Sequence, residues 1–187
     1  MINTDIETNM IEGLRKHQPH AQQTMIKLYG NHVFNQVVRL VLVVEDAEEI
    51  YQDIFLKVFH NIHMYDENKS SLKTWISRIT YNETITYLRH KRQKIIYFED
   101  EEWELESLSE SEVEMTLGQP DKETVQLIRT ALKQLPPDER SIITMFYYEE
   151  MSLKEIAYVT DSIPTTIASK LCRTRKKLCK IIKMLQS

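Results

Sequence analysis

Glycine is scarce in this chain, whose 187 residues include three glycines and five prolines. So few glycines and turn dipeptides disfavour a sandwich or barrel built of many short strands. The glycines, Gly13, Gly30 and Gly118, also lie too far apart to supply a Walker A sequence or a G-x-G-x-x-G sequence. This spacing excludes the glycine-rich phosphate loops of the common ATP-binding and dinucleotide-binding folds.

Long apolar runs are absent as well. No stretch approaches the ~18 consecutive apolar residues of a membrane-spanning helix. The first ten residues, MINTDIETNM, do not join a basic patch to an apolar segment, so they do not resemble a signal peptide. We expect a soluble, cytoplasmic protein with no membrane insertion.

The sequence offers little for metal binding or catalysis. It has no Cys-x-x-Cys pair, and none of its six histidines follows a glutamate at the E-x-x-H spacing of helical di-iron sites. Cys172 and Cys179 are seven residues apart in a predicted helix, which places them about 10 Å apart at ~1.5 Å per residue, beyond disulfide reach. We predict two reduced thiols, no cofactor and no enzymatic activity.

Charge is distributed unevenly along the chain. The net charge is −4, but residues 1–94 sum to +1, residues 95–120 to −9 and residues 121–187 to +4. The last 24 residues hold seven lysines and arginines and no acidic residue, which makes a local positive patch despite the net sum. The acidic segment 95–120 has no sustained periodicity, so it indicates a linker between two domains, with an edge helix as the alternative.

Both flanks of this segment have helical patterns. Apolar residues recur every three or four positions from residue 47 to residue 62, and a second helix begins near Leu72 and ends in a basic cluster at residues 89–92. Trp75 lies on the apolar stripe of that helix, so we expect it in the core. Residues 21–44 support one or two further helices. The predicted fold class is all-α, with domains at 1–94 and 121–187.

The C-terminal flank predicts a helix-turn-helix. Ser152 and Glu155 form an S-x-x-E capping box that begins a short helix, and the pattern breaks at residues 160–162. A longer basic helix then starts near Pro164, since proline is well accommodated in a first turn. A short helix, a tight turn and a basic helix are typical of DNA binding, with a solvated basic face as the alternative.

These segments together resemble the bacterial RNA polymerase sigma factors of the extracytoplasmic-function (ECF) branch. Residues 46–57, DAEEIYQDIFLK, are similar to the D-A-E-D-L-x-Q-E-x-F-L-K segment of that family, and residues 72–82 to its F-x-T-W-L-x-R-I-x-x-N segment. In the second flank, residues 131–140 match A-L-x-x-L-P-x-x-x-R, and residues 166–175 align with T-V-K-S-R-L-x-R-A-R. The two blocks occur in the order of the family.

The resemblance implies a promoter-specificity subunit with three contact surfaces. The first docks on the clamp helices of the largest subunit of core RNA polymerase, through Asp46, Glu49, Gln52 and Asp53. The second recognises and melts the −10 element of promoter DNA, through Asn68, Lys69, Ser70, Arg78, Tyr81, Asn82, Arg89 and Arg92. The third binds the −35 element as duplex, through Thr165, Thr166, Ala168, Ser169, Lys170, Arg173, Lys176 and Lys177.

Some positions of this sequence depart from the family pattern. Thr86 stands where the family usually has aspartate, Asp161 replaces the turn glycine, and Ala168 and Lys170 replace a usual lysine and arginine. Lysine lacks the bidentate guanine contact of arginine, which leaves the −35 preference open.

Family members are often held inactive by an anti-sigma factor, which the sequence neither shows nor excludes. A helix-turn-helix regulator that acts without polymerase is the alternative function.

Overall fold

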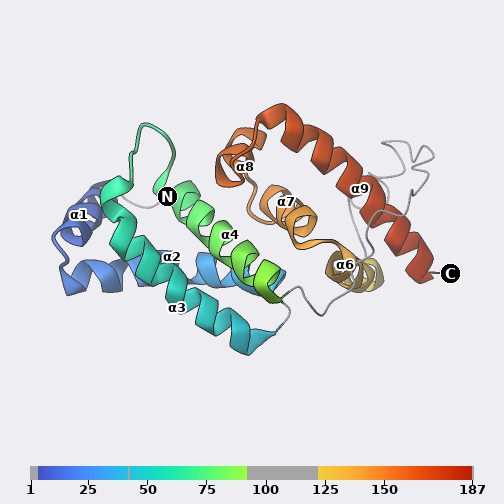
Figure 1. The fold of residues 1–187 in the computed structure, drawn as a ribbon, viewed down its shortest axis with the longest axis horizontal. Helices are drawn as coiled ribbons and strands as arrows, with labels where there is room; N and C mark the ends of the chain where they lie inside the picture. Colours follow the sequence, from blue (N-terminus) through green and yellow to red (C-terminus); the bar gives the residue numbers. More distant parts are fainter. Residues whose placement is uncertain (1–3, 42, 92–121, 187) are drawn as a thin grey trace. The chain divides into compact units, whose positions relative to one another are not determined.

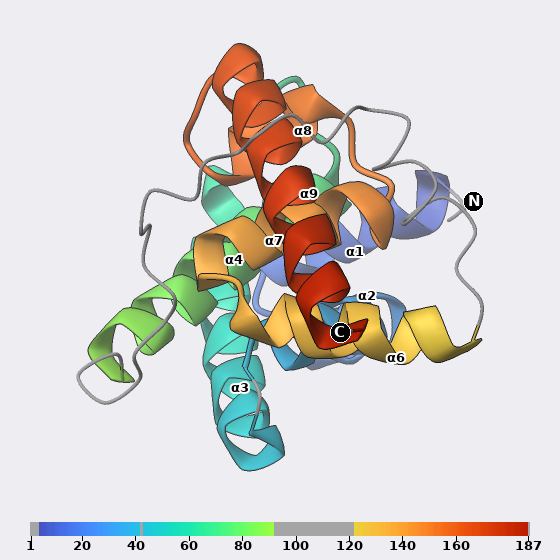
Figure 2. The same cartoon turned by 90° about the vertical axis from the view of Figure 1, so that its right-hand side faces the viewer.

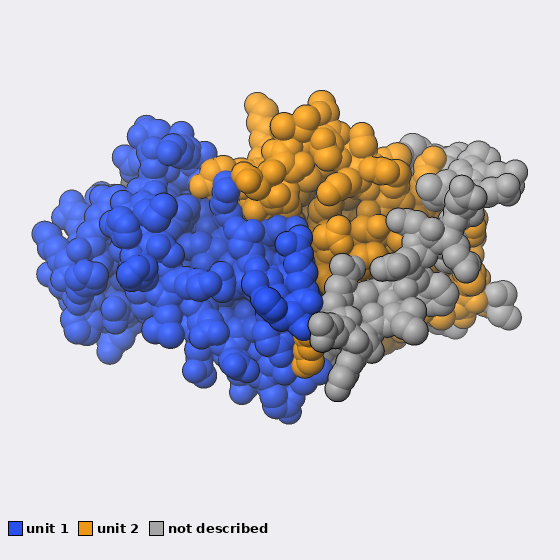
Figure 3. Space-filling view, in the orientation of Figure 1, with its two compact units in different colours: residues 1–90 blue, residues 91–187 orange. Residues whose placement is uncertain are grey.

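The computed structural model describes residues 4–41, 43–91 and 122–186, and the chain divides into two compact units, residues 1–90 and residues 91–187 (Figure 1). Figure 3 colours the two units separately. Within the described ranges the regular elements are helices, without any strand, which confirms the all-α prediction. The predicted linker, residues 95–120, lies outside the described residues.

The described residues of unit 1 form a bundle of four α-helices and one turn of 3-10 helix. The elements are α1 (Thr4–Arg15), α2 (Pro19–Leu40), α3 (Val44–Asn61), η1 (Ile62–Met64) and α4 (Leu72–Lys91). The region predicted to hold one or two helices forms the single helix α2, which begins with proline at its first turn. Helix α1 was not predicted, although Ile6, Met10, Ile11 and Leu14 recur at helical spacing.

The core of unit 1 follows the apolar periodicity of the sequence. On α3 the predicted stripe is buried, at Ala47, Ile50, Ile54, Phe55 and Val58. Helix α2 packs between α1 and α3. The side chains of Trp75 and of Leu72 on α4 are buried in the same cluster, as expected for a core anchor. The bundle therefore leaves the polar faces of α3 and α4 on its surface.

A close helix contact fixes α1 against α2. A methyl group added at Gly13 would lie 2.8 Å from Cβ of Ala21, so the absence of a side chain allows the two helices to approach. The turn between them places His17 in the left-handed region, with φ of 55°. This turn reverses the chain direction, so that α1 packs against α2. Helix α1 also contacts η1.

Unit 2 is a second helical bundle. Its described elements are α6 (Lys122–Gln134), α7 (Pro137–Tyr147), α8 (Leu153–Val159) and α9 (Pro164–Gln186). The long helix α9 packs against α6, α7 and α8, as the turned view makes visible (Figure 2). Its buried residues include Ile167, Leu171, Leu178 and Ile182. None of the helices in the described part of the chain is long and apolar enough to cross a membrane.

Candidate nucleic-acid interface

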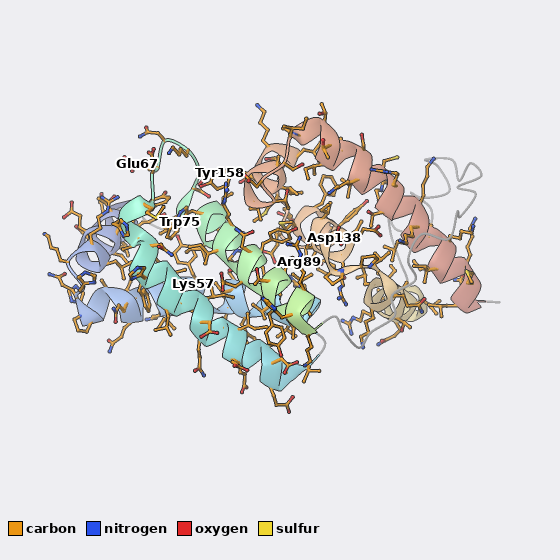
Figure 4. The ribbon with its side chains drawn as sticks, viewed as in Figure 1. Lys57, Glu67, Trp75, Arg89, Asp138 and Tyr158 are labelled. Carbon is orange, nitrogen blue, oxygen red and sulfur yellow. The ribbon has the colours of Figure 1, made fainter. Side chains whose placement is uncertain are left out.

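The loop between η1 and α4 is held by a buried tyrosine. The ring of Tyr65 lies 5.6 Å from the ring of Trp75, and its hydroxyl donates a hydrogen bond to the carbonyl of Ser70 over 3.2 Å. Tyr65 thus connects the first and last parts of the loop and ties both to the core. Figure 4 labels Glu67 on this loop and Trp75 at the start of α4.

Hydrogen bonds within the loop give it a defined conformation. The carboxylate of Asp66 accepts bonds from the backbone N–H and from the side-chain amide of Asn68, each over 3.0 Å. The backbone bond above all, then the amide bond, lowers the pKa of Asp66, because both stabilise the charged form. The carboxylate also pairs with the ammonium of Lys69 over 3.7 Å. Asn68 and Lys69 remain exposed, and Ser70 is half-buried.

The other side chains predicted to act at the −10 element lie on α4. Spacings of three, four and eleven residues place Arg78, Tyr81, Asn82 and Arg89 on one side of that helix. Asn82 and Arg89 are exposed, whereas Arg78 and Tyr81 are half-buried. Arg92 lies outside the described residues. The helix begins with a hydroxyl cap, since Ser71 Oγ accepts from the N–H of Thr74 over 3.2 Å.

A small cavity separates the loop from α1. It has a volume of about 290 Å³, close to the lower end for ligand pockets. Its lining is mostly polar and charged, from Thr8, Ile11, Glu12 and Arg15 on α1 and Tyr65, Asp66, Glu67 and Asn68 on the loop. The guanidinium of Arg15 donates to the carbonyl of Tyr65 over 3.2 Å. Sequence patterns gave no indication of this contact, because α1 and the loop are 50 residues apart.

The predicted polymerase-docking residues lie on α3. Glu49, Gln52 and Asp53 are exposed, and Asp46 is half-buried. Leu56, three or four residues beyond Asp53 and Gln52, is 66% exposed on the same side of the helix. The surface is therefore acidic around an apolar side chain that sequence periodicity did not single out. Lys57, also labelled in Figure 4, pairs instead with Glu83 on α4 and joins the two helices.

The helix-turn-helix of unit 2 has the predicted capping box. The hydroxyl of Ser152 accepts a bond from the N–H of Glu155, and the carboxylate of Glu155 accepts from the N–H of Ser152 over 2.9 Å. In the turn, Asp161 takes the left-handed conformation with φ of 53°, where the family pattern has glycine. The N–H of Ser162 donates to the carbonyl of Ala157 and closes the turn.

The first turns of α9 present neutral side chains, and the basic ones follow. Thr165, Ala168 and Ser169 are exposed, while Thr166 and Lys170 are half-buried. The hydroxyl of Ser169 donates to the carbonyl of Thr165 over 3.1 Å, so its lone pairs remain to accept bonds from other groups. Ile163, just before the helix, is 61% exposed and was not among the predicted residues. Farther along, Arg173 is exposed and Lys176 is half-buried.

Lys177 does not fit the predicted −35 surface. Its side chain is 10% exposed, and its ammonium lies 3.3 Å from a carboxylate oxygen of Glu139 on α7. The sequence prediction grouped it with Lys176 because both are basic, although one residue turns a helix by about 100°. Lys177 is therefore a packing residue between α7 and α9, and we remove it from the DNA-contacting set.

Metal-ligating side chains do not cluster in the described ranges. They contain no group of three or more histidine, cysteine, aspartate or glutamate side chains that could hold a metal ion. The rings of His60 and His63 are nearly perpendicular, with centroids 6.5 Å apart, and Nδ1 of His63 bonds to the carbonyl of His60. Neither cysteine of the described residues takes part in a disulfide, and Cys179 is buried while Cys172 is half-buried.

Comparison with known proteins gives two family matches in separate parts of the chain. Residues 25–94 match sigma-70 region 2, and residues 125–178 match sigma-70 region 4. Similar proteins include the ECF RNA polymerase sigma factors SigW and SigM of Bacillus subtilis. SigW is 27% identical over 91% of this chain and 93% of its own length. SigM is 24% identical over 81% of this chain and 89% of its own length.

Solved structures support the same fold. The structure of CnrH in complex with the cytosolic domain of CnrY matches with a TM-score of 0.67 at 16% identity, over 96% of this chain and 98% of that chain. The sigma factor RpoE in complex with the anti-sigma factor NepR from Bartonella quintana matches with a TM-score of 0.61 at 20% identity, over 86% and 96%. Identities this low establish similarity of fold.

Proposed function

Because the chain belongs to the sigma-70 family of bacterial RNA polymerase sigma factors, in its extracytoplasmic-function branch, we propose that it binds core RNA polymerase and directs promoter-specific initiation. The observation that carries this proposal is the presence of both sigma-70 regions, in order, on separate units of one chain. Residues 1–94 and 121–187 are the proposed functional domains, joined by the acidic segment 95–120. Catalysis of RNA synthesis belongs to the polymerase in this proposal.

The exposed face of α3 is the proposed polymerase-docking surface. Glu49, Gln52 and Asp53 surround the exposed Leu56, and Asp46 extends the acidic character toward the start of the helix. Such a surface suits the basic coiled coil of the clamp helices, since opposite charges steer the encounter and an apolar centre adds buried area. A surface acid that is merely solvated would contribute no polymerase affinity.

The loop after η1 and the polar side of α4 are the proposed −10 site. Melting exposes bases that must be held by polar edges and stacking surfaces. Asn68 and Lys69 supply exposed amide and ammonium groups, and Arg78 and Arg89 supply positive charge toward phosphates. The hydroxyl of Ser70 is buried, so Ser70 stays in the proposal on sequence alone. Tyr81 and Asn82 complete this side of the helix. Arg92 stays in the proposal on sequence alone.

Helix α9 is the proposed −35 reader. The N-terminal residues of a recognition helix contact base edges in the major groove, which assigns this role to Thr165, Thr166, Ala168, Ser169 and Lys170. Arg173, about one turn later, is a further candidate reader of base edges. Lys176, about two turns later, is assigned to phosphates, which position the helix without specifying sequence. The buried ion pair of Lys177 holds α9 on α7 so that these residues share a rigid support.

An inhibitory protein partner is the last part of the proposal. One structural relative was solved with an anti-sigma factor. A partner of this class would act on the present chain by covering the α3 face or the α9 face, since both are exposed and charged. Competition between such a partner and core polymerase is the expected behaviour.

Separable variants test the proposal. Glu49→Gln with Asp53→Asn should weaken binding to core polymerase roughly tenfold, while Arg173→Ala should leave that affinity unchanged and reduce the protein-dependent transcript. Glu150→Gln, which removes an exposed acid from unit 2, is the control for the loss of negative charge. If the α3 variant binds core polymerase as tightly as the parent chain, the assigned docking surface is wrong. Tight duplex binding without any polymerase binding would favour the stand-alone regulator.

A further inference from the structure

Helix α1 reaches a part of unit 1 that the proposed function places at the −10 DNA. It lies before the segment that matches sigma-70 region 2, which begins at residue 25. It nevertheless contacts η1 and lines one side of the cavity whose other side is the loop of residues 65–68. The loop therefore has a neighbour that the matched region does not include.

One hydrogen bond connects this neighbour to the loop across that cavity. Nη2 of Arg15, the last residue of α1, donates to the backbone carbonyl of Tyr65, the residue that enters the loop. Tyr65 in turn holds Ser70 through its hydroxyl and Trp75 through its ring. A displacement at the Tyr65 carbonyl would thus be transmitted to both ends of the loop.

Packing alone does not hold the loop on this side, because the cavity of about 290 Å³ lies between it and α1. The charges around the cavity favour the observed position of Arg15. Asp66 and Glu67 line the cavity from the loop, and their carboxylates attract the guanidinium toward the loop, whereas Glu12 lines the cavity from α1. The adjacent Lys16 carries the same charge and is exposed like Arg15, but its ammonium has no partner among the described residues.

We infer that Arg15 is a positioning residue that holds the loop of residues 65–70 in the conformation that engages the opened −10 strand. The inference rests on the proposed function of that loop. Arg15 acts through the Tyr65 carbonyl and does not itself contact DNA in this account. Helix α1 then belongs to the promoter-opening apparatus, although it lies outside the matched family region.

The first test uses the free full-length chain and does not depend on promoter activity. The N–H groups of Asn68 and Lys69 bond to Asp66, so their exchange with water reports the conformation of the loop. Arg15→Gln should accelerate this exchange roughly threefold to tenfold, the effect of losing one partly exposed charge-assisted hydrogen bond. Lys16→Gln should leave it unchanged, and Arg15→Lys should restore part of the protection. Equal exchange in Arg15→Gln and the parent chain would overturn the inference.

The second test uses holoenzyme and separates binding from opening. With increasing promoter concentration, Arg15→Gln should lower the rate of open-complex formation several-fold and leave the half-saturating concentration unchanged. A promoter with a premelted −10 region should restore most of the lost rate. A thermal melt establishes that the variant is folded. Arg15→Lys, which keeps the positive charge, should recover part of the opening rate and so distinguishes loss of the hydrogen bond from a general defect of the protein.

The outcomes distinguish this inference from the proposed function. Equal losses of opening rate in Arg15→Gln and Lys16→Gln would attribute the effect to charge alone and overturn the positioning role. Normal opening by Arg15→Gln would overturn it while leaving the sigma function intact. Failure of the parent chain to support transcription with polymerase that it binds would overturn the proposed function, while the exchange experiment would still decide whether Arg15 holds the loop.

Discussion

Adjacent lysines on α9 provide a direct test of how the structure separates packing from DNA contact. Lys177 is 10% exposed and pairs with Glu139 over 3.3 Å, whereas Lys176 is half-buried and forms no ion pair with the described residues of α7. We predict that Lys177→Met lowers the free energy of unfolding of unit 2. Lys176→Met should instead weaken binding to −35 duplex and leave stability nearly unchanged.

The size of the stability effect follows from the burial of the ion pair. Removing one partner of a fully buried pair costs about 3–5 kcal/mol, because the other charge is left unpaired. The Glu139 side chain is 25% exposed and can regain some hydration, so we expect about 1–3 kcal/mol for Lys177→Met. Glu139→Gln in the same chain should recover part of this loss. Lys176→Met should change stability by less than about 0.5 kcal/mol.

Urea unfolding of the full chain, followed by circular dichroism, measures the stability of each variant. Binding to −35 duplex over a series of salt concentrations measures the phosphate contacts, and loss of one contact should lower the slope of log K against log salt by about 0.9. Lys176→Met should show this change in slope and Lys177→Met should not. A reduced salt slope in Lys177→Met at unchanged stability would refute the placement of Lys177 in the core.

Three further predictions concern local features. Ser152→Ala should destabilise unit 2 by about 1 kcal/mol through loss of the helix cap, measured by urea unfolding, with Ser152→Thr retaining most of the stability. Gly13→Ala should destabilise unit 1 by about 1–3 kcal/mol, because the new methyl would lie 2.8 Å from Ala21, and an unchanged melting temperature would contradict that contact. The depressed pKa of Asp66 means that its hydrogen bonds to Asn68 persist above the ordinary carboxyl pKa and are lost as the pH falls through the lower folded value. A carboxyl titration by NMR should show that this pKa rises only part of the way toward its ordinary value in Asn68→Ala, because the backbone N–H, the main cause of the depression, remains.

Sequence patterns that involve only nearby residues predicted much of the fold. The three-and-four spacing of apolar residues predicted the buried stripe of α3, because that stripe is the only way to bury those side chains together. The S-x-x-E pattern predicted the start of α8 for a similarly local reason, since all of its partners lie within one turn. Asp161 stands where the family pattern has a turn glycine, and it adopts the left-handed conformation expected at that position.

Features that depend on contacts between distant residues were not predictable in this way. The placement of helix α1 in the bundle is set by its fit against Ala21 and η1. The bond from Arg15 to Tyr65 joins residues 50 positions apart, and the pair of Lys177 with Glu139 joins residues 38 apart. Sequence patterns locate basic residues on a helix, but the packing of neighbouring helices decides which of them face solvent.

The central claim is that this chain gives core RNA polymerase its promoter specificity. Run-off transcription with bacterial core polymerase and a promoter library, with and without the protein, tests it most directly. We predict transcripts that depend on the protein and share two upstream sequence motifs, one near −10 and one near −35. Identical transcript sets with and without the protein, with polymerase that demonstrably binds it, would contradict the claim.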